Sequence, residues 1–151
     1  MQTTTRFQKF LVLAAVALTA TFAVADDGGK NGVNNNNNGE VRLRAKLSGP
    51  AIQNKTPEGS ADFRMDDKGR ARLNVEVENV NLPAANVLTV AIVHAGASTT
   101  AGTITLSATG FGELELESQN GAIVPAVQAG DMVTFSNGAT VVLTGIFASM
   151  S

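Results

Sequence analysis

The 151-residue chain contains no cysteine, tryptophan or tyrosine, and its one histidine is His94. Without cysteine it cannot form disulfides, thiol nucleophiles or cysteine-ligated metal centres. Histidine is the side chain that ordinarily titrates near neutrality, so a chain with one histidine has few options for general acid or base catalysis. The lack of tryptophan and tyrosine removes the usual stacking surfaces for sugars. We therefore expect no enzymatic activity, no catalytic residues and no bound metal or other cofactor.

The first 25 residues have the pattern of a secretory signal peptide. Arg6 and Lys9 precede an apolar run over residues 10–18, and small side chains at Ala23 and Ala25 provide a cleavage site before Asp26. The apolar run is shorter than the roughly 20 residues that a membrane-spanning helix needs. The sequence therefore predicts that residues 1–25 are removed on export, and that the mature chain has no membrane span and is secreted or periplasmic.

Residues 26–39 are rich in asparagine and glycine, and Val33 is their only apolar residue. Such a segment cannot bury enough surface to offset its ordering entropy, so we expect a flexible tether before a domain at residues 40–151. Loss of the signal peptide leaves nine basic and 13 acidic residues. Nucleic-acid binding requires a basic surface, so this balance argues against it. The partner that we expect is an unidentified component of the cell envelope or extracellular space.

The domain alternates apolar and polar residues with the period of half-buried β-strands, as in Val41-Arg42-Leu43-Arg44-Ala45-Lys46-Leu47. The alternation and the turn signals together predict eight strands, at residues 41–48, 60–66, 70–79, 87–94, 102–108, 112–118, 131–136 and 139–147. Short strands at this spacing indicate an all-β fold. We expect an antiparallel β-sandwich of the Ig-like or Greek-key type, with a small closed β-barrel as the alternative.

Turn chemistry and strand hydrophobicity give further expectations. Asp66-Asp67-Lys68-Gly69 fits a type I turn closed by a glycine of positive φ, and Asn137-Gly138 fits a two-residue hairpin. Residues 87–93 and 141–147 are more continuously apolar, which predicts central strands covered on both sides. We interpret Ser98-Thr99-Thr100 as a loop. His94 is the last residue of the predicted strand at residues 87–94, where we expect it to bond to backbone or water.

Basic and acidic residues are divided along the chain. All 11 lysines and arginines lie at or before Arg72, whereas the charged residues after it are acids. Arg42, Arg44 and Lys46 share one face of the first strand. We expect them to face glutamates on a neighbouring strand, either Glu76 and Glu78 or the ladder at residues 113–117. The alternative is that the three cations form an anion-binding stripe.

Carboxylates provide the main rival hypothesis, a carboxylate-dependent hydrolase that uses Glu113, Glu115 or Asp131. Glu113, Glu115 and Glu117 share one strand face, with neighbours about 6.5–7 Å apart, within the range for inverting glycosidases. An exposed strand supplies no cleft and no apolar pocket, so a charged solvent-facing ladder is the preferred interpretation. The interpretation that we prefer is a non-catalytic structural or binding module of the cell envelope or extracellular space. A glycan- or anion-binding module is the second alternative.

Four segments in order resemble chordin-type (CHRD) domains, namely Leu47-Ser48-Gly49, Pro57-Glu58-Gly59-Ser60-Ala61-Asp62-Phe63, Leu73-Asn74-Val75-Glu76-Val77 and Ala91-Ile92-Val93-His94-Ala95-Gly96. The resemblance covers about residues 43–96 and implies an extracellular β-sandwich like that of copper-zinc superoxide dismutases. Ile92 stands where the first histidine of the family's H-I-H would be, which removes the basis for a metal or dismutase function. Residues 124–131 are similar to small exported bacterial proteins of unassigned function.

Signal-peptide cleavage is directly testable. Intact-mass analysis of the exported protein should give an N-terminus at Asp26, because Ala23 and Ala25 are the small side chains that signal peptidase accepts. A membrane-bound product that begins at Met1 would contradict the assignment.

Overall fold

The computed structural model describes residues 39–150, which form antiparallel strands and one short 3-10 turn. The strands are β1 (Val41–Ser48), β2 (Glu58–Met65), β3 (Ala71–Glu78), β4 (Val87–His94), β5 (Ala97–Thr105), β6 (Gly112–Glu117), β7 (Met132–Asn137), β8 (Thr140–Ile146) and β9 (Ala148–Ser149), with the 3-10 turn η1 (Ser118–Asn120) after β6. The predicted signal peptide, and the predicted tether up to residue 38, lie outside the described residues. No helix in the described part has the length and apolar character needed to cross a membrane.

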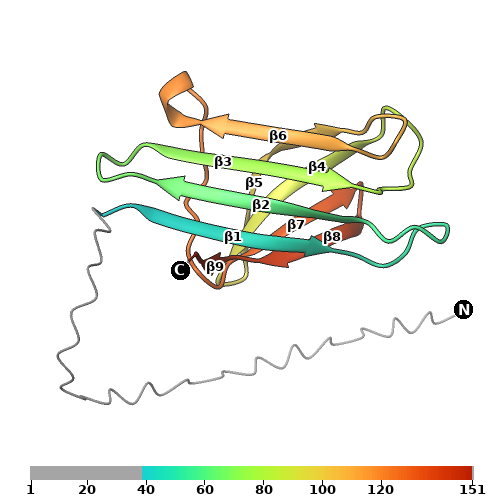
Figure 1. Cartoon of the computed structure of the whole chain (residues 1–151), viewed down its shortest axis with the longest axis horizontal. Helices are drawn as coiled ribbons and strands as arrows, with labels where there is room; N and C mark the ends of the chain where they lie inside the picture. The colour runs from blue at the N-terminus through green and yellow to red at the C-terminus, as the bar shows by residue number, and fades with distance from the viewer. Residues whose placement is uncertain (1–38, 151) are drawn as a thin grey trace, which may run out of the picture. The chain divides into compact units, whose positions relative to one another are not determined.

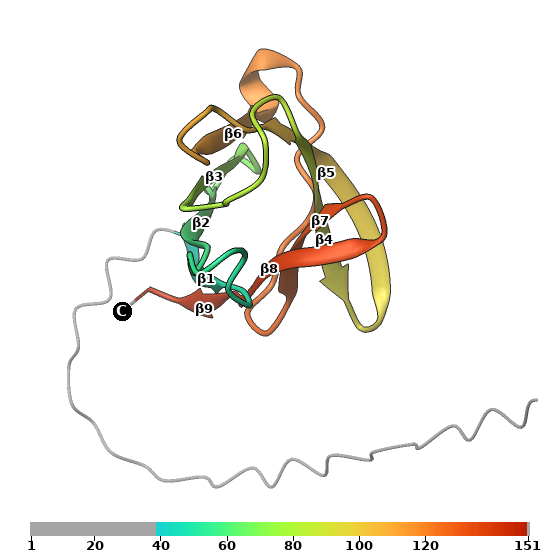
Figure 2. The same ribbon diagram turned by 90° about the vertical axis from the view of Figure 1, so that its right-hand side faces the viewer.

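The strands form one antiparallel sheet in the order β5-β4-β7-β8-β1-β2-β3-β6, and β9 pairs with β1 beside this path. In Figure 1, β6, β3, β2 and β1 form a front layer, and β4, β7 and β8 cross behind it. The turned view in Figure 2 shows the sheet curling so that β5 approaches β6, which nearly closes a barrel. The predicted all-β antiparallel class is therefore confirmed.

The predicted alternation places one face of each strand in the core. In β1, Leu43, Ala45 and Leu47 are buried and the cations between them are exposed. Phe63, Phe135 and Phe147 are the largest buried side chains and come from both layers. Each fully buried side chain of this size contributes about 1.5–3 kcal/mol through the hydrophobic effect. The apolar half of the pattern therefore sets which face of every strand turns outward.

Two of the predicted strands are interior strands, but they are covered on only one side. β4 lies between β5 and β7, and β8 lies between β7 and β1. Their outward side chains reach solvent, since Val87 is 47% exposed and Ile146 is 56% exposed. The prediction of coverage on both sides is therefore wrong. Valine and isoleucine are favoured in strands on either face because they are β-branched. Hydrophobicity alone therefore does not distinguish a strand covered on both faces from one covered on a single face.

The segment expected to be a loop after His94 is the first half of β5. Ala95 and Gly96 form a two-residue turn with φ of 48° and 84°, and His94 is directly opposite Ala97. Positive φ at both central positions is typical of a type I′ hairpin turn. β5 therefore begins at Ala97, five residues before the predicted start of this strand.

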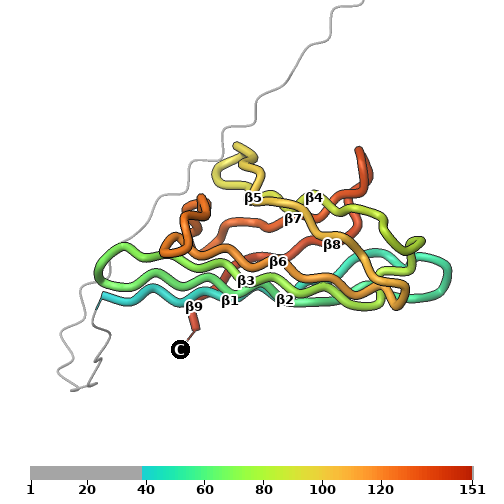
Figure 3. Tube along the Cα trace, turned by 90° about the horizontal axis from the view of Figure 1, so that it is seen from above, coloured from blue at the N-terminus to red at the C-terminus, as the bar shows by residue number. Residues whose placement is uncertain are grey.

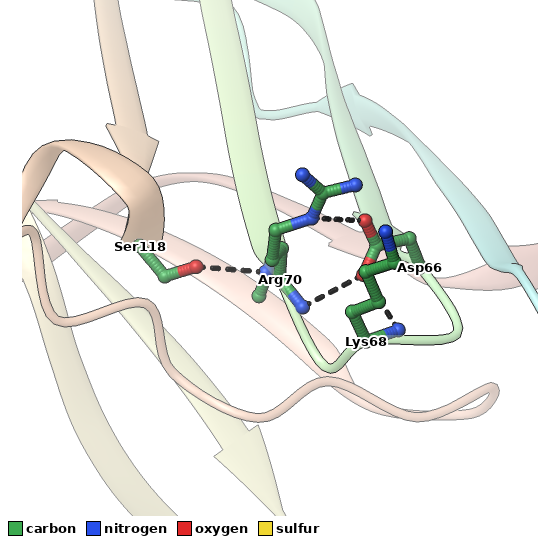
Figure 4. Close-up of polar contacts among 5 residues, drawn as sticks. Asp66, Lys68, Arg70 and Ser118 are labelled. Atoms are coloured by element: carbon green, nitrogen blue, oxygen red, sulfur yellow. Dashed lines mark hydrogen bonds and ion pairs between the residues drawn. The ribbon is translucent and has the colours of Figure 1, made fainter.

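The turn between β2 and β3 is held by Asp66. Its Oδ1 accepts hydrogen bonds from the backbone N–H groups of Lys68 and Arg70, and its Oδ2 lies 2.5 Å from Arg70 Nε (Figure 4). The Arg70 backbone bond is the main cause that lowers the pKa of the Asp66 carboxyl. Gly69 has φ of 75°, as predicted. Ser118 Oγ accepts the Ala71 N–H, which attaches η1 to this hairpin.

Glycine allows β8 and β1 to cross closely. A Cβ atom on Gly49 would lie 1.8 Å from the Val142 carbonyl oxygen, and one on Gly145 would lie 2.6 Å from the Lys46 carbonyl oxygen. Real Cβ atoms do not approach backbone oxygens this closely. The two layers are therefore joined at a point where side chains must be absent.

Substitution at this crossing should destabilise the fold. We expect Gly145→Ala to lower the free energy of unfolding by about 1–3 kcal/mol, because the added methyl overpacks a rigid backbone contact. Urea denaturation measures this change. Thr140→Ala, at an exposed position of the same strand, is the matched control and should stay within about 0.5 kcal/mol of wild type. Equal stability of the two variants would contradict the close crossing.

Candidate anion-binding site

Cross-strand rows of polar side chains cover the outer face of the front layer. The first row contains Arg42 of β1, Arg64 of β2 and Arg72 of β3, each directly opposite the next. Like charges at directly opposed positions repel and destabilise a sheet. We call these three residues the arginine row. It has no stabilising value as a set of cross-strand pairs, so it calls for an explanation other than sheet pairing.

The second row lies beside the arginine row and mixes charges. It contains Arg44 of β1, Asp62 of β2 and Asn74 of β3 in direct opposition. A pocket of about 340 Å³ lies between the two rows. The side chains that line it are Arg44, Asp62, Arg64, Arg72, Asn74 and Met150. We call this the arginine pocket.

Met150 forms the apolar part of the arginine pocket. The chain passes from β8 through the buried Phe147 into β9, and β9 pairs with β1 at Leu43 and Arg44. The Met150 N–H then donates to the Arg42 carbonyl oxygen at 3.1 Å. This bond holds the methionine beside the cations of β1.

Most arginines around the pocket are bound by acids. Arg44 Nε lies 3.0 Å from Asp62 Oδ1, with a second contact from Nη2 to Oδ2 at 3.3 Å. Arg72 forms ion pairs with Glu115 and Glu117 of β6. These partners direct both guanidinium groups toward neighbouring carboxylates.

The other two members of the arginine row differ from each other. Arg42 Nη2 lies 2.8 Å from Glu40 Oε2, and this hydrogen bond is the main cause that lowers the pKa of Glu40. Within residues 39–150, by contrast, Arg64 forms no ion pair, although its side chain lines the pocket. Arg64 is therefore the guanidinium best placed to bind an added anion.

The predicted charge pairing of the first strand is wrong in its partners. We expected Arg42, Arg44 and Lys46 to face Glu76 and Glu78 or the glutamates of β6. The strand order instead places β2 and β8 beside β1, and β3 and β6 lie farther along the sheet. The glutamates of β6 pair with Arg72 of β3, and β1 pairs through Arg44 with β2.

The three residues of the predicted anion-binding stripe lie in different places relative to the arginine pocket. Of these three residues, only Arg44 lines the pocket; Arg42 lies in the arginine row, and Lys46 is opposite Ser60, away from the pocket. The pocket runs across strands, so Arg64 and Arg72 were missed. A signal for them existed, because the turn at residues 66–70 fixes the hairpin register and places these two arginines opposite each other.

The carboxylates proposed for a hydrolase lie in different surroundings. Glu115 and Glu117 bind Arg72, and Glu113 is directly opposite Glu76. Asp131 directly precedes β7 and contacts His94 at the end of β4. The carboxylates named for that hypothesis are therefore not brought together around one site.

His94 and Asp131 form the second polar contact of interest. His94 Nδ1 lies 2.6 Å from Asp131 Oδ1, and Asp131 Oδ2 accepts the Gln128 N–H at 2.8 Å. Asp131 is buried, whereas the His94 side chain is 55% exposed. The expectation that His94 bonds to backbone or water is therefore corrected to a carboxylate partner. The buried aspartate anchors the start of β7 and the loop before it.

Among the described residues, no three histidine or carboxylate side chains gather closely enough to hold a metal ion. Comparison of the sequence with protein-family models and with curated proteins gave no match. The functional argument therefore depends on the arginine pocket itself.

The aspartate contact predicts a stability difference between two variants. Asp131→Ala should lower the free energy of unfolding by about 1–3 kcal/mol, because the part-buried Gln128 N–H loses its acceptor. His94→Ala should cost less than about 1 kcal/mol, since half of that side chain is in water. Thermal and urea denaturation of both variants measure the difference. A larger loss in the histidine variant would reverse the assignment of the anchor.

Proposed function

We propose that this protein is an exported, non-catalytic module of the cell envelope or extracellular space that binds a small hydroxylated anion in the arginine pocket. The observation that carries the proposal is the pair of Arg64 and Arg72, which lie directly opposite each other in the pocket. Within residues 39–150, Arg64 has no ion-pair partner. A bound anion offsets the repulsion between these two cations. The chordin-type resemblance, which implies an extracellular sandwich, is consistent with this location.

The chemistry of the pocket favours a carboxylate or sulfate ligand. A guanidinium presents parallel N–H donors that match two oxygens of such a group. Arg64 provides this fork, and Arg72, oriented by the glutamates of β6, lies directly opposite it. Charge-assisted hydrogen bonds of this kind are stronger than neutral ones, so the anionic group would determine the position of the ligand.

The remaining lining residues suit the rest of an acidic sugar. Asn74 supplies an amide donor and acceptor, and Asp62 supplies carboxylate oxygens that accept from hydroxyl groups. Met150 provides an apolar contact for a ring face. A volume of about 340 Å³ is at the lower end of small-molecule pockets, which suits one sugar unit. A uronic acid or a sulfated sugar fits these requirements.

The same residues favour binding over catalysis. Arginine stays protonated in proteins and cannot exchange a proton with a substrate. The one carboxylate in the pocket, Asp62, is held by two contacts from Arg44. No lining residue is thus suited to general acid or base chemistry, which supports a module that recognises its ligand without changing it.

Arg64 provides the test. Titration of the protein with glucuronate, followed by amide chemical shifts, should give saturable changes on β1, β2 and β3, whereas glucose should not. Arg64→Gln should weaken glucuronate binding by about tenfold or more, because a charged hydrogen bond contributes about 1.5–3 kcal/mol. The binding should also weaken as salt is added.

Lys46→Gln is the matched control, since it removes one exposed cation from the same face outside the pocket. It should leave the affinity within about twofold of wild type, as expected for a screened distant charge. Equal losses in the two variants would indicate general charge attraction and would overturn the assigned site. Equal binding of glucose and glucuronate would overturn the anionic specificity. Inorganic sulfate, tested in parallel, separates recognition of the charge from recognition of the sugar ring.

A further inference from the structure

We propose that the first half of β5, Ala97–Ala101, is a strand-addition edge that pairs with the same edge of a second copy of this chain. β5 is the terminal strand of the sheet, so only one of its sides is occupied, by β4. Among the described residues, no other backbone group bonds to Ala97–Ala101. The outer edge of this segment therefore presents unpaired N–H and C=O groups, which can be completed by another strand.

The two halves of β5 differ in how they are covered. Ala97–Thr100 are exposed on both faces of the strand, whereas Ile104 is buried. In the second half, the Leu114 side chain of β6 packs over Gly102. A register shift leaves Ala101 without a direct partner on β4 and marks the boundary between the halves. Ala97–Thr100 therefore have both faces and the edge in solvent, and the partly buried Ala101 closes the segment on the core side.

The hairpin of β4 and β5 extends this edge away from the rest of the domain. Figure 3 shows the yellow end of the hairpin projecting from the trace, and Figure 2 places it on the side away from β1, β2 and β3. Its two-residue turn at Ala95 and Gly96 has positive φ at both positions, a geometry that matches the twist of the paired strands. A partner strand can therefore approach without contact with the charged front layer.

The edge lacks the charges and prolines with which many natural edge strands prevent strand addition. Its one irregularity is the register shift at Ala101, at the inner end of the proposed pairing segment. β5 has no lysine, proline or carboxylate, and β4, β7 and β8 contain no lysine, arginine, aspartate or glutamate. The opposite terminal strand, β6, has Glu113, Glu115 and Glu117. The contrast within one sheet indicates that β5 is accessible to pairing and β6 is protected.

The sequence of the edge is complementary to itself. Antiparallel pairing about a two-fold axis at Thr99 places Ala97 opposite Ala101 of the second copy, and Ser98 opposite Thr100. Thr99 then lies opposite its own symmetry mate. Threonine pairs with threonine or serine favourably across strands, and no charge is brought together. This self-complementarity favours a second copy over an unrelated peptide, and the closed two-fold arrangement is the commonest form of homo-oligomer.

A charge placed at the axis tests the proposal. Sedimentation velocity of the wild-type protein between about 10 µM and about 1 mM should show a weak, reversible monomer–dimer equilibrium, as expected for a small interface. Thr99→Lys should weaken the dimer by about fivefold, because it places two like charges directly opposite. Thr103→Lys, an exposed position in the second half of β5, should leave it unchanged.

Mixing variants separates a pairing defect from a folding defect. Thr99→Lys and Thr99→Glu should each associate weakly alone, and an equimolar mixture should recover association, because opposite charges then meet at the axis. Failure of the mixture to recover association would overturn the proposed register. A wild-type protein that remains monomeric at the highest concentration would overturn the proposal itself.

Hydrogen exchange identifies the occupant of the edge. Amides in residues 97–101 should become more protected as protein concentration rises, because a second copy completes their hydrogen bonds. Protection that is strong and independent of concentration would mean that another part of the same chain covers the edge, and would overturn the assignment to a second copy. Loss of dimerisation in both lysine variants would place the contact elsewhere.

Discussion

The crossing of β8 over β1 is the contact on which the arrangement of this domain depends. Gly49 and Gly145 remove the side chains that would otherwise hold the two backbones apart. Because the strands meet there, the chain can continue through the buried Phe147 and lay β9 against β1. Met150 then reaches the pocket. One lining residue of the proposed site is thus positioned by a backbone contact in another part of the sheet.

The outer surface of the domain has two chemically different halves. The front layer of β1, β2, β3 and β6 carries the charges, with the arginine row at one end and the opposed pairs Glu58–Glu78 and Glu76–Glu113 toward the other. The layer of β4, β5, β7 and β8 presents threonine, serine, alanine and valine. One apolar core lies between the two layers. The two outer faces can therefore carry separate interactions on one scaffold.

Local pattern predicted most of the strands, because burial imposes a period of two on each of them. Leu43, Ala45 and Leu47 are buried as their spacing requires, and the Asp66 turn follows from side-chain bonding over four residues. β5 was placed too late, since its exposed Ser98, Thr99 and Thr100 have no apolar alternation to mark a strand. This segment is a strand because it pairs with β4, and the sequence alone does not identify β4 as its neighbour.

The order of strands in the sheet explains the errors at the candidate site. The charged positions of each strand were visible in the sequence, but their pairing depends on which strands become neighbours. β8 returns to pair with β1 from nearly 100 residues away, and no local rule gives that contact. Arg64 and Arg72 could have been placed opposite each other from the turn alone. Their meeting with Arg44, Asn74 and Met150 requires the whole sheet.

The glutamates of β6 also bear on how far this sheet could grow. A strand that adds to β5 of one molecule and to β6 of the next would give a head-to-tail contact, and such contacts continue into open fibres unless the rotation closes a ring. Three carboxylates on β6 make that edge a poor acceptor for further strands. Growth in one direction is thereby blocked, so the domain can expose an uncharged edge without becoming a unit of a polymer.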